Sequence, residues 1–89
     1  MTKEVLMMVM AGCPHCVRAR QMMAELCETH PEYATVQVKI VDETIEKEFA
    51  ASLDYYYVPT FFVAGEKVHE GRPTLEAIER VFQAALASI

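Results

Sequence analysis

An unbroken apolar run, Val5 to Met10, stops at Gly12 and gives way at once to Pro14 and a helical pattern. A strand that is apolar on both faces belongs inside a sheet, where both faces are covered. Proline is tolerated at the first position of a helix because that position needs no backbone donor. The run is far shorter than the roughly 20 apolar residues of a membrane span. The sequence therefore predicts a central strand that feeds directly into a helix, and no membrane partner.

The rest of the chain alternates between strand and helix patterns. Helices are expected at 14–28, from the capping residues Asp42 and Thr44 to about Leu53, and from Pro73 onward. Strands are expected at 35–41, 60–64 and 68–70, with a loop at 29–32 and a tight turn at 64–67. The order β-α-β-α-β-β-α predicts an α/β fold in which three helices flank a four-stranded mixed sheet. The 89 residues leave room for one core, so we expect a single domain over 1–89.

Three of these segments also predict how side chains are distributed. Val36, Val38 and Ile40 share one face of their strand. The short helix has apolar positions at i, i+4 and i+8, and the last helix has a continuous apolar stripe. These two apolar sets are Ile45, Phe49 and Leu53, and then Leu75, Ile78, Val81, Phe82, Ala85, Leu86 and Ile89.

Charge and cysteine content exclude several classes of protein. The chain has 13 acidic and 8 basic residues and a net charge of −5. A nucleic acid or an anionic membrane requires a basic face, so neither is an expected partner. Three cysteines are an odd number, which excludes a fully paired disulfide scaffold.

Cys13-Pro14-His15-Cys16 carries most of the chemical information in the chain. Two cysteines three residues apart can close into a disulfide at a helix start, because the non-helical first residue lets the sulfurs approach. The unpaired N–H groups and the dipole at a helix N-terminus favour negative charge. A thiolate placed there is stabilised, and its pKa falls from about 8.5 into the range of about 3.5–7.5. We expect a reactive dithiol tuned by Pro14, His15 and the helix start.

Position assigns different roles to the two cysteines. Cys13 precedes the first helical turn and is expected to be exposed, so we predict that it is the nucleophile. Cys16 lies one turn inside the helix and is expected to be more covered, which suits a resolving thiol. Cys13 would attack a substrate disulfide, and Cys16 would then break the mixed disulfide.

A metal site is the alternative, because a Cys-x-x-Cys pair is also half of a zinc site. Zinc takes four ligands, usually including a second pair. Cys27 lies eleven residues beyond Cys16, which is about 16 Å along the same helix and too far to share a metal or a disulfide. We therefore expect no metal, with Cys27 filling the core and His30 and His69 on the surface.

Val58-Pro59-Thr60 stands directly ahead of the strand at 60–64. Proline is allowed at the start of a strand, and a simple turn would account for it. A cis bond would instead direct the backbone N–H and C=O of Val58 toward a peptide lying across the sulfurs. Only about 5–6% of such bonds are cis, so the residues alone leave both interpretations open.

Together these features resemble the thioredoxin superfamily over nearly the whole chain. Gly12-Cys13-Pro14-His15-Cys16-Val17-Arg18-Ala19 is similar to a glutaredoxin segment. Gly71-Arg72-Pro73-Thr74 is similar to the small archaeal and bacterial thioredoxins of glutaredoxin-like size. The resemblance implies that Pro59 is cis and lies against the sulfurs. It also implies a substrate groove, which comprises Pro14, His15, Tyr57, Val58, Pro59 and Gly71, with Arg72 beside them.

Two departures from glutaredoxins bear on glutathione. The basic residue that usually precedes the first cysteine is replaced by Met10, and the usual late Gly-Gly pair is replaced by Glu70-Gly71. A carboxylate at Glu70 would repel the carboxylates of glutathione, whereas Arg72 would offset that repulsion. Tyr55, Tyr56 and Tyr57 are candidates for an apolar rim to the groove, or else cap the core.

The resemblance implies a cytoplasmic, monomeric thiol–disulfide oxidoreductase that reduces protein disulfides through the Cys13–Cys16 pair. Its partners would be disulfide-containing proteins and an electron donor, either a thioredoxin reductase-type enzyme or glutathione. No bound cofactor is expected, and glutathione would be a co-substrate. One alternative is a glutathione-dependent glutaredoxin. Another is a binding or metal-holding module that uses the same fold without turnover.

Overall fold

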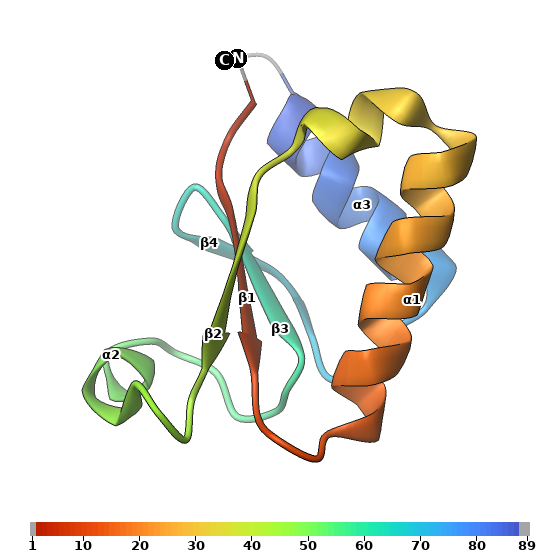
Figure 1. Ribbon diagram of the computed structural model, residues 1–89. Helices are drawn as coiled ribbons and strands as arrows, with labels where there is room; N and C mark the ends of the chain where they lie inside the picture. The colour runs from red at the N-terminus through yellow and green to blue at the C-terminus, as the bar shows by residue number, and fades with distance from the viewer. Residues whose placement is uncertain (1, 88–89) are drawn as a thin grey trace.

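The sheet has the order β2-β1-β3-β4, with β1 parallel to β2 and antiparallel to β3 (Figure 1). The computed structural model describes residues 2–87. The strands are β1 (Val5–Val9), β2 (Val38–Asp42), β3 (Thr60–Val63) and β4 (Glu66–Glu70), and β3 and β4 form an antiparallel hairpin. The predicted α/β fold with a four-stranded mixed sheet is confirmed.

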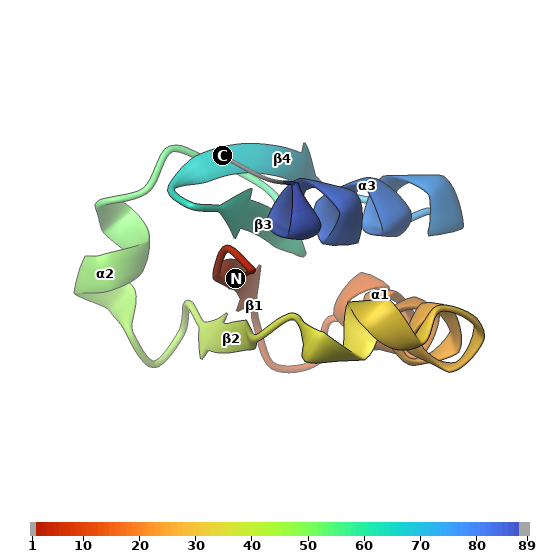
Figure 2. The same ribbon diagram turned by 90° about the horizontal axis from the view of Figure 1, so that it is seen from above.

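Helices cover the two faces of the sheet unequally. α1 (Pro14–Thr29) and α3 (Leu75–Leu86) lie on one face, and the short α2 (Lys47–Ala51) lies beside the other (Figure 2). The first core packs β1 and β3 side chains such as Met7 and Phe61 against α1 and α3. The second core is smaller and centres on Met8, Val41 and Phe62. Because β1 supplies both cores, its apolar character on both faces is explained.

The segment after α1 is more ordered than the loop that the sequence predicts. Pro31–Thr35 forms a 3₁₀ helix, and β2 begins at Val38. This 3₁₀ helix contains Tyr33. The ring of Tyr33 stacks on Phe82, and its hydroxyl donates to Glu79 Oε2 at 2.8 Å. Burial, followed by this hydrogen bond, raises the pKa of Tyr33. The buried side chain of Tyr33 thus orders this segment, for which the polar residues around it predict only a loop.

The region between β2 and β3 departs furthest from the predicted helix. Asp42 caps a turn instead of a helix: its Oδ1 accepts hydrogen bonds from the Thr44 N–H at 2.8 Å and from the Thr44 hydroxyl at 2.6 Å. These bonds lower the pKa of Asp42. Helix α2 has only five residues: Ile45 precedes it and is 78% exposed, and Phe49, within it, is 40% exposed. Of the predicted apolar face, Leu53 alone packs against the second core.

Ile40 is a second apolar residue whose exposure the sequence pattern does not predict, because the pattern puts it on the same strand face as Val36 and Val38. It is exposed on the outer strand β2, whereas Val41, which points to the opposite face, is buried in the second core. Because β2 is an edge strand, its side chains are buried only where a helix or loop extends over the edge of the sheet.

The C-terminal part follows the prediction closely. Thr74 caps α3 by accepting a hydrogen bond from the Ala77 N–H at 3.1 Å. Ile78, Val81, Phe82 and Ala85 are buried, Leu75 is exposed, and Ile89 lies outside the described residues. β4 begins two residues earlier than predicted, because Ala64 and Gly65 alone make the turn. Among residues 2–87, no helix has the length and apolar character needed to cross a membrane.

Candidate active site

The junction between β1 and α1 places two sulfurs at a helix start. Gly12 has φ of +75°, a conformation that glycine adopts without strain, and it turns the chain from the strand toward the helix. Cys13 is the N-cap, and its carbonyl accepts the first helical hydrogen bond from the Val17 N–H at 3.2 Å. Pro14 occupies the first helical turn, where no backbone donor is required.

Cys13 and Cys16 are joined in a disulfide, with their Cα atoms 5.2 Å apart. The Cys16 N–H donates to Cys13 Sγ at 3.1 Å. This bond is an N-capping hydrogen bond like those made by serine or aspartate side chains, because it satisfies one of the backbone amides left free at the helix N-terminus. A negative charge on Cys13 Sγ would receive the same donor and the positive end of the helix dipole.

The predicted exposure of Cys13 is wrong. Cys13 is 6% exposed and Cys16 is 4% exposed, so both belong to the buried part of the site. The reason is the cap: the Cys13 side chain folds over the helix end to accept from Cys16 instead of pointing outward. Pro14 and His15, between the two cysteines, are the exposed members of the motif.

The Val58–Pro59 peptide bond is cis, as the family resemblance implies. Pro59 precedes β3, which is antiparallel to β1 with Met8 opposite Thr60. The loop before β3 and the loop after β1 therefore leave the sheet at the same end, which brings the Val58–Pro59 segment and the disulfide to one side of the molecule (Figure 1).

Hydrogen bonds hold this segment on both sides of Val58. The Tyr57 carbonyl accepts from the hydroxyl of the buried Thr60, and the Pro59 carbonyl accepts from the Gly71 N–H at 2.9 Å. Within residues 2–87, no hydrogen bond engages the backbone of Val58 itself. Gly71 has φ of +88° and lies beside Tyr57. A Cβ atom built onto Gly71 would lie 3.8 Å from the Cβ of Tyr57. The predicted groove residues Tyr57, Val58, Pro59 and Gly71 are thus brought together.

Glu70 has a role that the sequence did not indicate. Its Oε2 accepts hydrogen bonds from two consecutive backbone amides, those of Tyr56 and of Tyr57 (2.9 Å for the latter). Its Oε1 is paired at 2.8 Å with Lys67 Nζ, which also donates to the Asp54 carbonyl at 3.2 Å. We call this arrangement the Glu70 clamp. It fixes the loop that leads into the cis-proline and neutralises the carboxylate expected to repel anions.

The clamp predicts an acid-dependent contribution to stability. Lys67, then the two tyrosine amides, lower the pKa of Glu70 from 4.5 to about 2. A carboxyl group whose pKa is lower in the folded state stabilises the fold above its ordinary pKa, and this is lost as pH falls toward the folded value. Glu70→Gln is therefore expected to lower Tm by a few degrees at neutral pH, with the deficit shrinking between pH 4.5 and about 2.

The measurement is thermal unfolding followed by circular dichroism across that pH range. Glu66→Gln, an exposed position on the same strand, is the matched control and is expected to behave as wild type. A Glu70→Gln deficit that stays constant down to the acid end would show that the carboxylate charge has no part in the clamp.

The tyrosines divide between the two interpretations of the sequence. Tyr55 packs against the second core, and its hydroxyl donates to Glu43 Oε1 at 2.6 Å. Burial, then this hydrogen bond, raises the pKa of Tyr55. Tyr56 is 84% exposed and Tyr57 is 70% exposed. Tyr55 therefore caps the core, and the other two form an exposed aromatic border beside the cis-proline.

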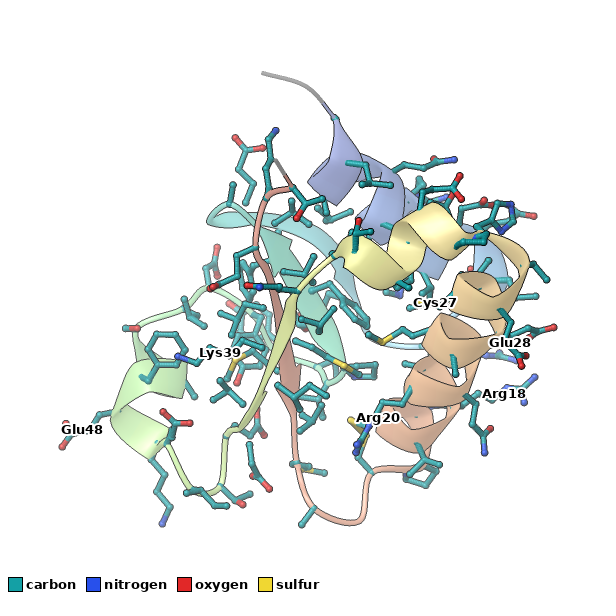
Figure 3. All side chains as sticks on the ribbon, turned by 45° about the horizontal axis from the view of Figure 1, so that its top comes forward. Arg18, Arg20, Cys27, Glu28, Lys39 and Glu48 are labelled. Atoms are coloured by element: carbon teal, nitrogen blue, oxygen red, sulfur yellow. A yellow bond between two sulfur atoms is a disulfide. The ribbon has the colours of Figure 1, made fainter. Side chains whose placement is uncertain are left out.

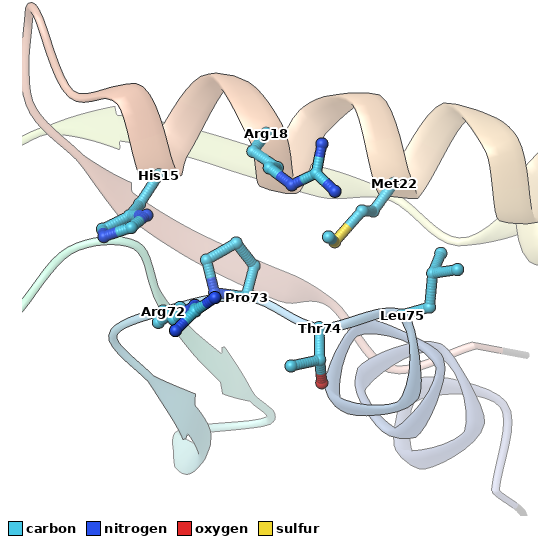
Figure 4. Close-up of a pocket in the computed structure, with 7 residues that line it drawn as sticks. All are labelled: His15, Arg18, Met22, Arg72, Pro73, Thr74 and Leu75. Atoms are coloured by element: carbon cyan, nitrogen blue, oxygen red, sulfur yellow. The ribbon is translucent and has the colours of Figure 1, made fainter.

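A groove of about 660 Å³ runs between α1 and the start of α3, and we call it the α1–α3 groove. Its lining residues come from two segments (Figure 4), namely His15, Arg18 and Met22 on one side and Arg72, Pro73, Thr74 and Leu75 on the other. The groove joins His15 to Arg72, two predicted site residues. Arg18 was not predicted as a site residue, although its i+3 spacing from His15 on the helix would have indicated a shared face.

A smaller hollow of about 210 Å³ opens on another face of α1 and is lined by Cys13, Cys16, Arg20 and Asp42, among others. Arg18 and Arg20 both project outward from α1, and Cys27 lies further along the same helix (Figure 3). The sequence did not single out Arg20 or Asp42 for this site, because they lie on separate elements that only the fold brings together.

The remaining candidate ligands lie apart from the disulfide. Cys27 is a free, half-buried thiol packed against the first core, and burial raises its pKa, as expected of a core-filling residue. His30 and His69, expected on the surface, are both partly exposed: His30 stacks on Tyr33, and His69 Nε2 donates to the Arg72 carbonyl at 2.9 Å. Within residues 2–87, no three His, Cys, Asp or Glu side chains are grouped to hold a metal ion.

Comparisons with known proteins agree with this geometry. Residues 1–83 match the family described as the thioredoxin domain. A solved structure titled "Structure of a malarial protein" is similar in fold, with a TM-score of 0.71, 14% identity, and coverage of 98% of this chain and 100% of that one. No curated protein matches the chain. Since the family match spans most of the sequence and includes the Cys13–Cys16 disulfide, the chain belongs to the thioredoxin-domain family.

Proposed function

We propose that the protein is a thiol–disulfide oxidoreductase that reduces disulfides in other proteins. The observation that carries the proposal is the Cys13–Cys16 disulfide at the start of α1, where the Cys16 N–H donates to Cys13 Sγ. A sulfur held at a helix N-terminus is poised to carry negative charge. A dithiol in this position can exchange with a substrate disulfide and return to the disulfide form.

The reaction begins from the reduced dithiol. The Cys13 thiolate attacks one sulfur of the substrate disulfide, which forms a Cys13–substrate mixed disulfide and releases the other substrate sulfur as a thiolate. Cys16 then attacks Cys13 Sγ, which forms the Cys13–Cys16 bond and releases the second substrate thiol. Two electrons and two protons pass to the substrate, and a cellular donor must supply them again.

The cis-proline segment supports a peptide substrate. The backbone N–H and C=O of Val58 are free of hydrogen bonds within the described residues, while both neighbouring carbonyls are occupied. An extended peptide beside the disulfide would find one donor and one acceptor there, which is the pattern of strand addition. His15, Tyr57 and Gly71 would border such a peptide.

A glutathione-dependent glutaredoxin reaction is the second candidate. The α1–α3 groove favours it, because Arg18 and Arg72 offer two guanidinium groups to the carboxylates of glutathione. The Glu70 clamp removes part of the sequence argument against it, since the Glu70 carboxylate is paired with Lys67.

A paired turnover assay on the reduced protein separates the two candidates. One arm supplies glutathione, glutathione reductase and a small mixed disulfide; the other supplies a thioredoxin reductase-type enzyme and a protein disulfide. We expect turnover in the second arm only. Turnover with glutathione alone would favour the glutaredoxin reaction, and turnover in neither arm, with chemically reduced protein also inert toward protein disulfides, would favour a non-catalytic binding module.

A further inference from the structure

The α1–α3 groove is positively charged within an acidic protein. The chain carries a net charge of −5, yet the residues that line the groove include Arg18, Arg72 and His15 and no carboxylate. Among residues 2–87, the ion pairs join Lys67 to Glu70 and His30 to Glu79, so both groove arginines are unpaired. Glu70 is the acidic residue nearest to Arg72 in the sequence, and its carboxylate is already bound to Lys67 and the Tyr57 N–H in the Glu70 clamp.

The groove also has apolar walls. Met22 and Leu75 lie near each other at one end of it, and Pro73 lies next to Arg72, toward His15 (Figure 4). Leu75 is exposed, and the exposed Tyr57 lies beside Gly71, the residue that precedes Arg72 in the chain. A ligand that fills this surface must offer a carboxylate and apolar side chains together. Glutathione has no side chain other than that of its cysteine to cover them.

The distance from the disulfide sets where that carboxylate would be. Arg18 lies five residues beyond Cys13, which corresponds to about 7.5 Å along the helix axis. An extended peptide advances about 3.3–3.6 Å per residue. A peptide whose cysteine is attacked by Cys13 would therefore bring its second or third flanking residue to the arginines.

Building on the proposed reductase function, we propose that the α1–α3 groove selects protein disulfides with an acidic residue two or three positions from the attacked cysteine. Arg18 and Arg72 bind that carboxylate, and Met22, Pro73 and Leu75 cover the adjoining apolar side chain. Charge-assisted, bidentate contacts are the strong form of carboxylate recognition, which suits a pair of arginines.

The test is single-turnover reduction of three disulfide peptides by the pre-reduced protein. The peptides are identical except for Glu, Gln or Lys at the position two residues from the reactive cysteine. We expect the second-order rate constant to be about two- to tenfold higher for the Glu peptide than for the Gln peptide, as for one or two exposed ion pairs. The Lys peptide should be slowest, and the preference should fall as ionic strength rises.

Variants assign the preference to the groove. The double variant Arg18→Gln, Arg72→Gln is expected to bring the Glu-to-Gln rate ratio close to one. Arg80→Gln removes one positive charge from an exposed position of α3 outside the groove and is expected to keep the ratio, as a control for each single arginine variant. Circular dichroism of each variant checks that it is folded.

The possible outcomes separate this proposal from the one on which it rests. If all three peptides are reduced equally, or if Arg80→Gln lowers the ratio as much as the double variant, the groove proposal fails and the reductase function stands. If the double variant slows exchange with a glutathione mixed disulfide and leaves the peptide ratio intact, the arginines serve glutathione instead. If no peptide is reduced, both proposals fail.

Discussion

Cys13→Ser is expected to lower the rate of disulfide reduction by roughly a thousandfold or more, as removal of a nucleophile does in other enzymes. A serine hydroxyl stays protonated at neutral pH and forms no mixed disulfide. The serine can still cap α1 by accepting from the Cys16 N–H, because serine is a preferred N-cap residue. The loss should therefore appear in activity and not in folding. The measurement is insulin-type protein-disulfide reduction, with Tm recorded for the same sample.

Two further cysteine variants test the assignment of roles. Cys16→Ser is expected to complete the first step and stop there, so mass spectrometry should detect a substrate adduct on Cys13 that a small dithiol removes. Cys27→Ala, in the first core, should keep full activity. Activity that survives Cys13→Ser, or a substrate adduct that forms on Cys16 in Cys13→Ser while Cys16→Ser forms none on Cys13, would contradict the roles proposed for the two sulfurs.

The largest expected effect on stability is at Phe61. Its side chain is fully buried in the first core, on the strand that lies between β1 and β4. Phe61→Ala is expected to lower the free energy of unfolding by about 3–5 kcal/mol, since it removes a large apolar group and leaves a cavity that the two inner strands cannot close. Equilibrium unfolding in urea, followed by circular dichroism, gives the value.

Two other substitutions make this stability prediction falsifiable. Phe61→Leu keeps most of the volume and is expected to lose about 1–2 kcal/mol, which allows a measurement if the alanine variant does not fold. Phe49→Ala, on α2 with 40% of its side chain exposed, is expected to lose about 1 kcal/mol or less. A Phe49→Ala loss equal to that of Phe61→Ala would mean that the second face of the sheet is as important as the first.

The features that could be predicted from the sequence are those set by neighbours along the chain. The apolar run in β1, the proline at the start of α1 and the Thr74 cap each act within a few residues, and each lies where expected. The Cys-x-x-Cys pair is equally local, because both sulfurs belong to one helical turn.

The features that escaped prediction depend on residues far apart in the sequence. Tyr33 orders its 3₁₀ helix by packing on Phe82, about fifty positions later. The sequence predicts a free charge at Glu70, because the backbone amides of Tyr56 and Tyr57 that bind it carry no sequence signal. The cis-proline followed from family resemblance and not from the residues alone.

The edge strands of the sheet determine whether a reductase of unfolded substrates would also bind those substrates non-specifically. An extended chain can add to any open strand, and a protein that handles misfolded partners risks collecting them along its edges. Here the outer strand β4 carries charged Glu66 and Lys67 and is interrupted opposite Phe61 and Phe62 by an irregular register. The other border, β2, exposes Lys39. Both borders therefore discourage strand addition, and under the proposed function the short backbone stretch at Val58 is where a substrate would be held and then released.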